Sequence, residues 1–254
     1  MFGPHDGRRV AVHPYRRMMT FLMRGRNESA VYFEHEIDLA RTQPWLADRR
    51  AKLFPLLLHA LAQTLHERER LNRFTLGHRV YQRTGVHLSF AAKKKMIDDA
   101  PLATVKREFA RGETLDQVSA AFSGDVADAR SDKKSHIDKE LGILLALPAF
   151  LLRMLVWLNA RLYKWGLAPR SIVDTDPMYA SAFVANLGSI QLDAAYHHLY
   201  EHGNCPLFVT VGKVRGDKLT MRYTFDERVE DGHYCARSLE LFKERVEDPA
   251  SWLA

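Results

Sequence analysis

The side chains best suited to acid–base chemistry gather in the last third of the chain. An acidic stretch there reads Phe225-Asp226-Glu227-Arg228-Val229-Glu230-Asp231-Gly232. Four histidines lie on either side of it: His197, His198, His202 and His233. Carboxylates and imidazoles act as general acids or bases only where the fold places them beside a reacting group. The pattern therefore indicates candidate acid–base residues. A single histidine more often has a structural role than a catalytic one.

Thiol chemistry has little support in this sequence. Cys205 and Cys235 are the only cysteines, and no Cys/His spacing typical of zinc accompanies them. Two cysteines cannot form a disulfide framework, so we expect no metal and a reducing cytoplasmic location. Nothing around Cys205 indicates the activated thiolate that a nucleophilic cysteine requires.

Composition and charge are those of an ordinary globular protein. The 254 residues are 46% hydrophobic and 27% charged, which disfavours disordered, collagen-like and coiled-coil classes. The formal net charge of +6 is compatible with a phosphate-bearing ligand or an anionic membrane surface. No basic module interleaved with aromatic residues is present, so we expect no nucleic-acid partner. The first six residues lack the apolar core of a secretory signal, and export is not expected.

Hydrophobic periodicity predicts a mixed order of strands and helices after an irregular basic arm over residues 1–15. Helices are expected at 16–24, 43–70 with a kink at Pro55, 102–109, 114–122 and 233–246. Strands are expected at 29–39, 78–82, 86–92, 180–186, 207–214 and 219–225, with turns at Gly85 and Gly216-Asp217 and a polar connection at 124–134. This order favours one α/β domain over residues 16–254.

Residues 141–165 form the most apolar stretch. Arg153, Asn159, Arg161 and Lys164 interrupt it before it reaches the length of about 20 residues that a bilayer span requires. A buried core helix is the favoured interpretation. The alternatives are a helix that lines an acyl pocket and one that rests on a membrane surface.

Three segments, in order, resemble the catalytic domain of the dihydrolipoyl acyltransferases of 2-oxoacid dehydrogenase complexes, within the chloramphenicol acetyltransferase-like superfamily. Ala185-Asn186-Leu187-Gly188-Ser189-Ile190 resembles the family's Ser-Asn-Leu-Gly segment. The strand from Cys205-Pro206 to Gly212-Lys213 resembles the next one, and residues 225–232 are similar to its signature Asp-His-Arg, two residues, Asp-Gly. Tyr15-Arg16-Arg17-Met18 ahead of Glu36-Ile37-Asp38 extends the likeness over residues 14 to 253.

The resemblance implies a two-layer α/β sandwich with a mixed sheet, and a homotrimer or larger cubic assembly whose active channel lies between subunits. It also implies an acyl-transfer reaction with coenzyme A or acyl-coenzyme A as substrate, and contacts to other complex subunits. The chain as given shows no lipoyl-bearing domain, lipoyl attachment or Ala/Pro linker.

The two positions that carry the family's chemistry are changed. The resemblance places Glu227 where the family has its histidine base, and Ala185 where it has the serine that stabilises the oxyanion. Proton transfer from a thiol costs about 3 kcal/mol to a histidine and about 6 kcal/mol to a carboxylate. Burial of the carboxylate recovers part of that gap, whereas the loss of an oxyanion donor costs about 10²- to 10³-fold in rate.

Other residues take supporting roles in this interpretation. Glu227 and Asp231 are the catalytic candidates, and Asp231 is also expected to hold the active-site loop through an arginine. Auxiliary and structural candidates follow: Ser181, Ser189, His198 and His233 as replacements for the lost groups, and Arg228, Gly232, Asn186 and Gly188 as scaffold. Lys93, Lys94 and Lys95 are the candidates for the phosphates of coenzyme A.

Two functions remain open at this stage. The first is acyl transfer from a coenzyme A thioester with Glu227 as base, to an amine or alcohol acceptor that loses its proton late. The second is a non-catalytic oligomeric scaffold that has kept the fold and lost the reaction. The sequence names neither the acyl group nor the acceptor.

Overall fold

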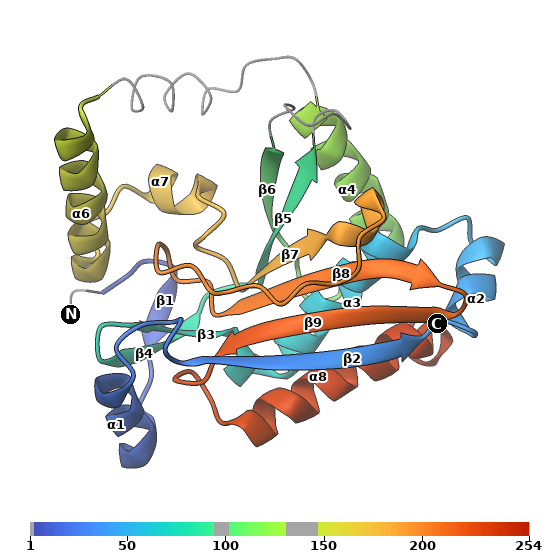
Figure 1. The fold of residues 1–254 in the computed structure, drawn as a ribbon, viewed down its shortest axis with the longest axis horizontal. Coiled ribbons are helices and arrows are strands. Elements are labelled where there is room, and N and C mark those ends of the chain that lie inside the picture. The colour runs from blue at the N-terminus through green and yellow to red at the C-terminus, as the bar shows by residue number, and fades with distance from the viewer. Residues whose placement is uncertain (1–2, 94–101, 131–146, 254) are drawn as a thin grey trace.

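The computed structural model describes residues 3–93, 102–130 and 147–253. Its centre is a six-stranded mixed sheet in the order β2-β9-β8-β7-β5-β6 (Figure 1). Strand β7 is parallel to both of its neighbours, and the other pairs are antiparallel. The strands are β2 (Ala30–Asp38), β5 (His87–Lys93), β6 (Leu102–Glu108), β7 (Ala182–Asn186), β8 (Leu207–Arg215) and β9 (Lys218–Asp226).

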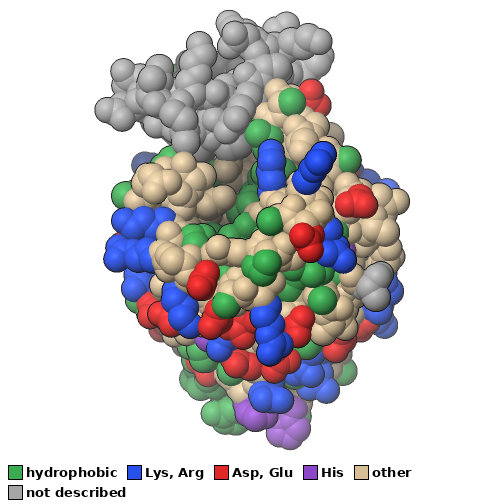
Figure 2. Space-filling view, turned by 90° about the vertical axis from the view of Figure 1, so that its right-hand side faces the viewer, with side chains coloured by type: hydrophobic (Ala, Val, Ile, Leu, Met, Phe, Trp, Pro, Cys, Tyr) green, Lys and Arg blue, Asp and Glu red, His purple; other side chains and the backbone are tan. Residues whose placement is uncertain are grey.

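One end of this sheet carries the β8–β9 turn and mixes acidic and basic side chains (Figure 2). The Lys218 ammonium lies 3.1 Å from an Asp38 oxygen across the β2–β9 pair. The Arg215 guanidinium lies 2.8 Å from Asp193. These two cations are thus neutralised locally.

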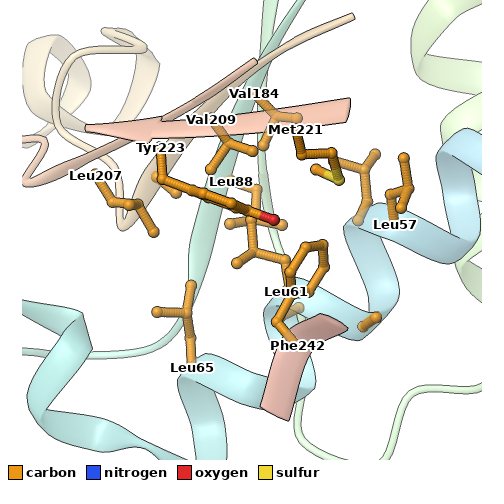
Figure 3. Close-up of a cluster of buried hydrophobic side chains, with 14 of the residues drawn as sticks. Leu57, Leu61, Leu65, Leu88, Val184, Leu207, Val209, Met221, Tyr223 and Phe242 are labelled. Atoms are coloured by element: carbon orange, nitrogen blue, oxygen red, sulfur yellow. The ribbon is translucent and has the colours of Figure 1, made fainter. Parts of the chain in front are cut away.

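Helices cover one face of the sheet and form the core with it. They are α3 (Leu53–Glu67), α4 (Leu115–Arg130) and α8 (Gly232–Glu247). Alternate residues of β9 point toward them, because side chains on a strand alternate between its two faces. Figure 3 shows Met221 and Tyr223 of β9 gathered with Leu61 of α3 and Phe242 of α8. This arrangement confirms the predicted two-layer α/β sandwich with a mixed sheet.

The opposite face of the sheet is crossed by the segment over residues 191–206, here called the strap. Polar side chains of the sheet hold it through its backbone. The Thr210 hydroxyl donates to Ala195 O at 2.6 Å, and the Thr224 hydroxyl donates to His197 O at 2.6 Å. The strap therefore lies directly over β8 and β9.

A small antiparallel sheet, β1-β4-β3, lies at the left end of Figure 1, together with α1 (Pro14–Leu22) and α6 (Ala149–Trp165). Its strands are β1 (Gly7–Arg9), β3 (Arg73–Leu76) and β4 (Arg79–Arg83). The remaining elements are α2 (Thr42–Asp48), α7 (Arg170–Thr175), and the short helices η1 (Glu69–Asn72), η2 (Leu187–Ile190) and η3 (Pro249–Ser251).

Several local predictions are wrong. The arm over residues 1–15 is partly regular, because β1 pairs with β4 and α1 begins at Pro14. The expected helix at 102–109 is strand β6, which pairs with β5 along its whole length. The expected long helix at 43–70 is two helices, separated at Arg50, whose φ is +50°, so the break precedes Pro55. The polar connection at 124–134 is helical as far as Arg130, and the rest of it lies outside the described residues.

Strands β4 and β5 also differ from expectation. A turn at Gly85 predicts a hairpin between them, yet β4 pairs with β1 and β3, while β5 belongs to the large sheet. Gly85 therefore connects two sheets, with φ +72°.

The apolar stretch at 141–165 is described from residue 147 onward, and the favoured core-helix interpretation is wrong for it. Within α6 only Tyr163 is buried. Phe150 is 70% exposed and Trp157 is 57% exposed. No described helix combines the length and the apolar character needed to cross a bilayer.

We predict that Tyr223→Phe stabilises the protein. The Tyr223 ring is fully buried, and its hydroxyl has no hydrogen-bond partner among the described residues. A buried polar group without a partner costs about 1–3 kcal/mol, and phenylalanine removes it without changing the shape of the core. Thermal unfolding of both proteins checks this, and an unchanged or lower melting temperature would contradict it.

Candidate active site

The end of β9 is fixed by a buried carboxylate. Asp226 is fully buried, and its oxygens accept hydrogen bonds from the Ser29 hydroxyl at 2.9 Å and the Thr75 hydroxyl at 3.2 Å. The Arg228 guanidinium donates to both oxygens, at 2.8 and 2.7 Å. Arg26 is also buried, which lowers the pKa of its guanidinium, while the Asp226 charge opposes that change. One carboxylate thus balances two buried cations.

Glu227 follows directly and is held by its backbone. Its N–H donates to Ser29 O at 2.9 Å, and its carbonyl oxygen accepts from the Arg16 guanidinium at 2.6 Å. The residue is half-buried. Its carboxylate forms no hydrogen bond or ion pair with any described residue. The backbone of Glu227 is therefore anchored, while the lone pairs of its carboxylate remain available.

Asp231 serves a different purpose. It caps the N-terminus of α8, where its side chain accepts from Tyr234 N at 2.8 Å. That hydrogen bond lowers the pKa of the Asp231 carboxyl. Arg16 is its arginine neighbour, at 4.0 Å, while Arg228 pairs with Asp226 instead. Gly232 starts α8, and a side-chain carbon at this position would meet open space.

A cleft of about 420 Å³ opens beside this loop. Its charged walls are Arg16 of α1, Arg70 of η1, Arg73 of β3, Glu230 and Asp231. Arg73 donates to the Glu230 carboxylate at 2.9 Å, and Arg70 lies 3.7 Å from the same oxygen. The three arginines exceed the two carboxylates by one charge, which favours an anionic group in the cleft. Sequence reasoning missed Arg70 and Arg73, since no local pattern connects them with the loop.

The second candidate region is the turn after β7. Ala185 is half-buried near the end of that strand, and the Asn186 side chain accepts from Ser189 N at 3.1 Å. Gly188 lies against β8, because a side-chain carbon there would be 2.4 Å from Gly212 O. Asn186 and Gly188 therefore shape the turn.

A small cavity of about 160 Å³ adjoins this turn. Asn186, Gly188 and Ser189 form one side of it. Its other walls are largely apolar: Leu53, Phe54, Leu57, Val211, Gly212, Val214 and Leu219. Such a slot suits a slender uncharged chain better than a charged group.

Neither candidate hydroxyl replaces the serine that Ala185 lacks. Ser181 is fully buried and accepts from His87 N at 2.9 Å. Ser189 is exposed, and its hydroxyl donates to Asn186 O at 2.7 Å. The Ser181 hydroxyl thus bonds to the start of β5, and the Ser189 hydroxyl bonds within its own turn.

The histidines lie on the strap and at the start of α8. The His197 ring stacks on Phe208 at 3.9 Å, and burial lowers the pKa of that imidazole. His198 contacts Leu199 O, while His202 pairs with Asp176 at 2.6 Å. His233 lies in the first turn of α8. Within the described part of the chain, no hydrogen bond or ion pair joins any of these imidazoles to Glu227.

The remaining candidates contribute less. Burial raises the pKa of the Cys205 thiol, which disfavours a thiolate. Lys93 ends β5, and Lys94 and Lys95 lie outside the described residues. In residues 3–93, 102–130 and 147–253, no group of three His, Cys, Asp or Glu side chains could hold a metal ion.

Ala185 and Glu227 are far apart within one chain. Ala185 on β7 is paired with Thr210 on β8, and Thr210 is paired with Arg222 on β9. Glu227 follows Arg222 by five residues in the chain. Strand rise and spacing then separate the two positions by about 17 Å along the sheet and about 10 Å across it. A site that uses both positions needs two copies of the chain.

Comparison with solved structures identifies the architecture. The cubic core of a pyruvate dehydrogenase multienzyme complex superimposes with a TM-score of 0.62 at 17% identity, over 96% of this chain and 94% of that one. The chain has the dihydrolipoamide acetyltransferase core fold. A probable dihydrolipoamide acetyltransferase from Listeria monocytogenes gives a TM-score of 0.58 at 15% identity, over 95% and 94% of the two chains. A chloramphenicol acetyltransferase gives 0.53 at 15% identity, over 95% and 98%.

The acetyltransferase core fold is thus confirmed at low sequence identity. No family sequence profile matches the chain, and no curated protein matches it. In the Azotobacter vinelandii dihydrolipoamide acetyltransferase, which has the same similarity scores as the cubic core, a serine, a histidine and an asparagine four residues later have been examined for roles in catalysis.

Proposed function

We propose that the protein transfers an acyl group from a coenzyme A thioester to an acceptor, with Glu227 as general base. The observation that carries this proposal is the Glu227 carboxylate, which has no partner among the described residues while its backbone is fixed on both sides. A carboxylate without a partner is free to accept a proton from a bound nucleophile. The resemblance places the family's histidine at this position, and Asp231 follows four residues later, where the Azotobacter enzyme has its asparagine.

In the proposed reaction, the nucleophile of the acceptor attacks the thioester carbonyl carbon and gives its proton to Glu227. The tetrahedral intermediate then collapses, the carbon–sulfur bond breaks, and the departing coenzyme A thiolate takes the proton. A carboxylate is a weak base, so an amine or alcohol that loses its proton late suits it better than a thiol.

Two features fit the substrates. The arginine-walled cleft beside Glu230 and Asp231 suits an anionic substrate group, and the apolar slot beside Gly188 suits a pantetheine or acyl chain. Lys93, Lys94 and Lys95 remain the proposed partners of the coenzyme A phosphates.

The site is proposed to form between subunits of a homotrimer, or of a larger assembly of trimers. The separation of about 20 Å between Ala185 and Glu227 supports this, since strand spacing within one chain cannot close it. A cyclic arrangement brings Glu227 of each copy to the Ala185 turn of the next.

Mixed assemblies test the shared site. Glu227→Gln removes the base, and Gly188→Ala disrupts the other half because its new carbon meets Gly212 O. Each variant alone is expected to be inactive in an assay of coenzyme A release. Refolded together in equal amounts, they restore about a quarter of the wild-type rate, since one interface in four then has both halves intact. If one variant alone keeps full activity, or the mixture stays inactive with assembly intact, the shared site is refuted.

We predict that Ala185→Ser accelerates the reaction. A hydroxyl at this position supplies the missing oxyanion donor, whose contribution is about 10²- to 10³-fold in rate. Steady-state measurement of kcat checks this, with Ala195→Ser on the exposed strap as the matched control. An unchanged kcat in the Ala185 variant would show that no oxyanion forms beside it.

A non-catalytic oligomeric scaffold is the second candidate. The observation that favours it is that Ser181 and Ser189 are both committed elsewhere, which leaves the Ala185 position without a hydroxyl. A scaffold assembles normally but neither binds coenzyme A nor responds to Glu227→Gln.

A further inference from the structure

The end of the molecule that carries α1 and α6 exposes large apolar side chains. On α1 they are Tyr15, Met18, Phe21 and Leu22, each at least half exposed. On α6 they are Phe150, Met154, Val156, Trp157, Leu158 and Trp165. Isolated exposed apolar residues are common, but ten on two helices at one end indicate an interaction surface.

Both helices flank the turn between β3 and β4. The Phe21 ring stacks on His78 at 4.0 Å, and His78 also contacts Thr20 O at 2.9 Å. On the other side, the Lys164 side chain lies 3.3 Å from the position of a side-chain carbon at Gly77. Figure 1 shows both helices at the same end of the long axis. We call this surface, formed by residues 7–27 and 147–173, the basic end.

The two segments of the basic end carry no acidic side chain, although Glu28 accepts a hydrogen bond from Arg24 N at 2.9 Å and Glu201 accepts one from Asn27 N at 3.0 Å. Neither segment contains an Asp or Glu. Its exposed cations are Arg8, Arg9, Arg17, Arg24, Arg153, Arg161, Lys164 and Arg170. None of these eight side chains forms an ion pair within the described part of the chain, whereas Arg215 and Lys218 at the opposite end are both paired.

The orientation of α6 is fixed by the hydrogen bonds of Tyr163, the one buried residue of this helix. The buried Tyr163 hydroxyl donates to Asp6 at 2.7 Å and contacts Asn204 of the strap. Asp6 in turn accepts from Arg83, 1% exposed, at 2.9 Å. The helix therefore cannot turn its apolar outer face inward without breaking a buried network.

We propose that the basic end docks on the surface of an anionic lipid bilayer. Apolar and tryptophan side chains then enter the boundary between headgroups and acyl chains, and the unpaired cations meet lipid phosphates. A second copy of the same surface fits poorly, because a two-fold contact would bring sixteen like charges together. This inference does not rest on the acyl-transfer proposal, but the two share α1, which also supplies Arg16 to the cleft beside the Glu230–Asp231 loop.

Vesicle co-sedimentation of the full chain tests the inference. The protein is expected to bind vesicles of phosphatidylcholine and phosphatidylglycerol, and to bind phosphatidylcholine alone at least about tenfold more weakly. Arg153→Gln and Arg161→Gln each lower the affinity about fivefold, as expected for one cation near an anionic surface. No binding to either kind of vesicle would overturn the proposal.

Apolar variants separate the bilayer from a protein partner. Phe150→Glu with Trp157→Glu is expected to abolish vesicle binding and to leave the mass in solution unchanged. Both side chains are exposed, so the fold tolerates the change, which circular dichroism verifies. Leu192→Glu on the strap, 53% exposed, is the matched control and keeps full binding. A lower mass of the double variant without vesicles would show that the surface joins copies of the chain, and would overturn the proposal.

Discussion

Glu227→Gln is expected to lower the rate of acyl transfer by about 10²- to 10⁴-fold, the usual contribution of a positioned general base. The amide keeps the shape of the side chain but cannot take a proton. The backbone contacts of this residue with Ser29 and Arg16 do not involve the side chain, so fold and assembly are preserved. Steady-state release of coenzyme A measures the effect.

Two further variants complete this prediction. Glu227→Asp keeps the charge on a shorter side chain and is expected to retain more activity than the glutamine variant. Glu227→His introduces the imidazole of the resembled family and is expected to restore activity toward thiol acceptors, because histidine is the stronger base. Wild-type turnover by Glu227→Gln would refute the assignment of the base.

Asp226→Asn is expected to destabilise the protein by about 3–5 kcal/mol, the largest effect on stability that we predict. The substitution leaves the buried Arg228 and Arg26 guanidinium groups without their shared counter-charge. Denaturant unfolding measures this loss. Because Asp226 also positions the start of the Glu227 loop, activity falls with stability in this variant.

Asp193→Asn is the matched control. Asp193 also pairs with an arginine, Arg215 at 2.8 Å, but both side chains are more than 60% exposed. Exposed ion pairs contribute about 0–1 kcal/mol, so this variant unfolds almost as the wild type does. Equal losses in the two aspartate variants would contradict the role given to burial.

Strong local patterns predict part of the fold correctly. The alternation in residues 29–39 and 219–225 gives β2 and β9, and Gly216-Asp217 forms the turn between β8 and β9. The apolar period of residues 233–246 gives α8. In each case one face of the element packs on a single core, so its period survives in the sequence.

The failures occur where tertiary contacts outweigh local preference. Residues 102–108 are a strand because they complete the edge of the sheet beside β5. The apolar side chains of α6 are mostly exposed, so burial in the core does not explain them. Composition alone does not distinguish a core helix from an interfacial one. Resemblance locates Glu227 and Ala185, but the cleft between α1, η1 and β3 exists only after folding.

The most direct test of the central claim is calorimetric titration of the purified protein with acetyl-coenzyme A, with its mass in solution recorded on the same sample. We predict micromolar binding, one site per chain, to a trimer or a multiple of a trimer. An intact assembly that binds no coenzyme A, or a monomer, would contradict the proposal and leave a scaffold with an acetyltransferase fold.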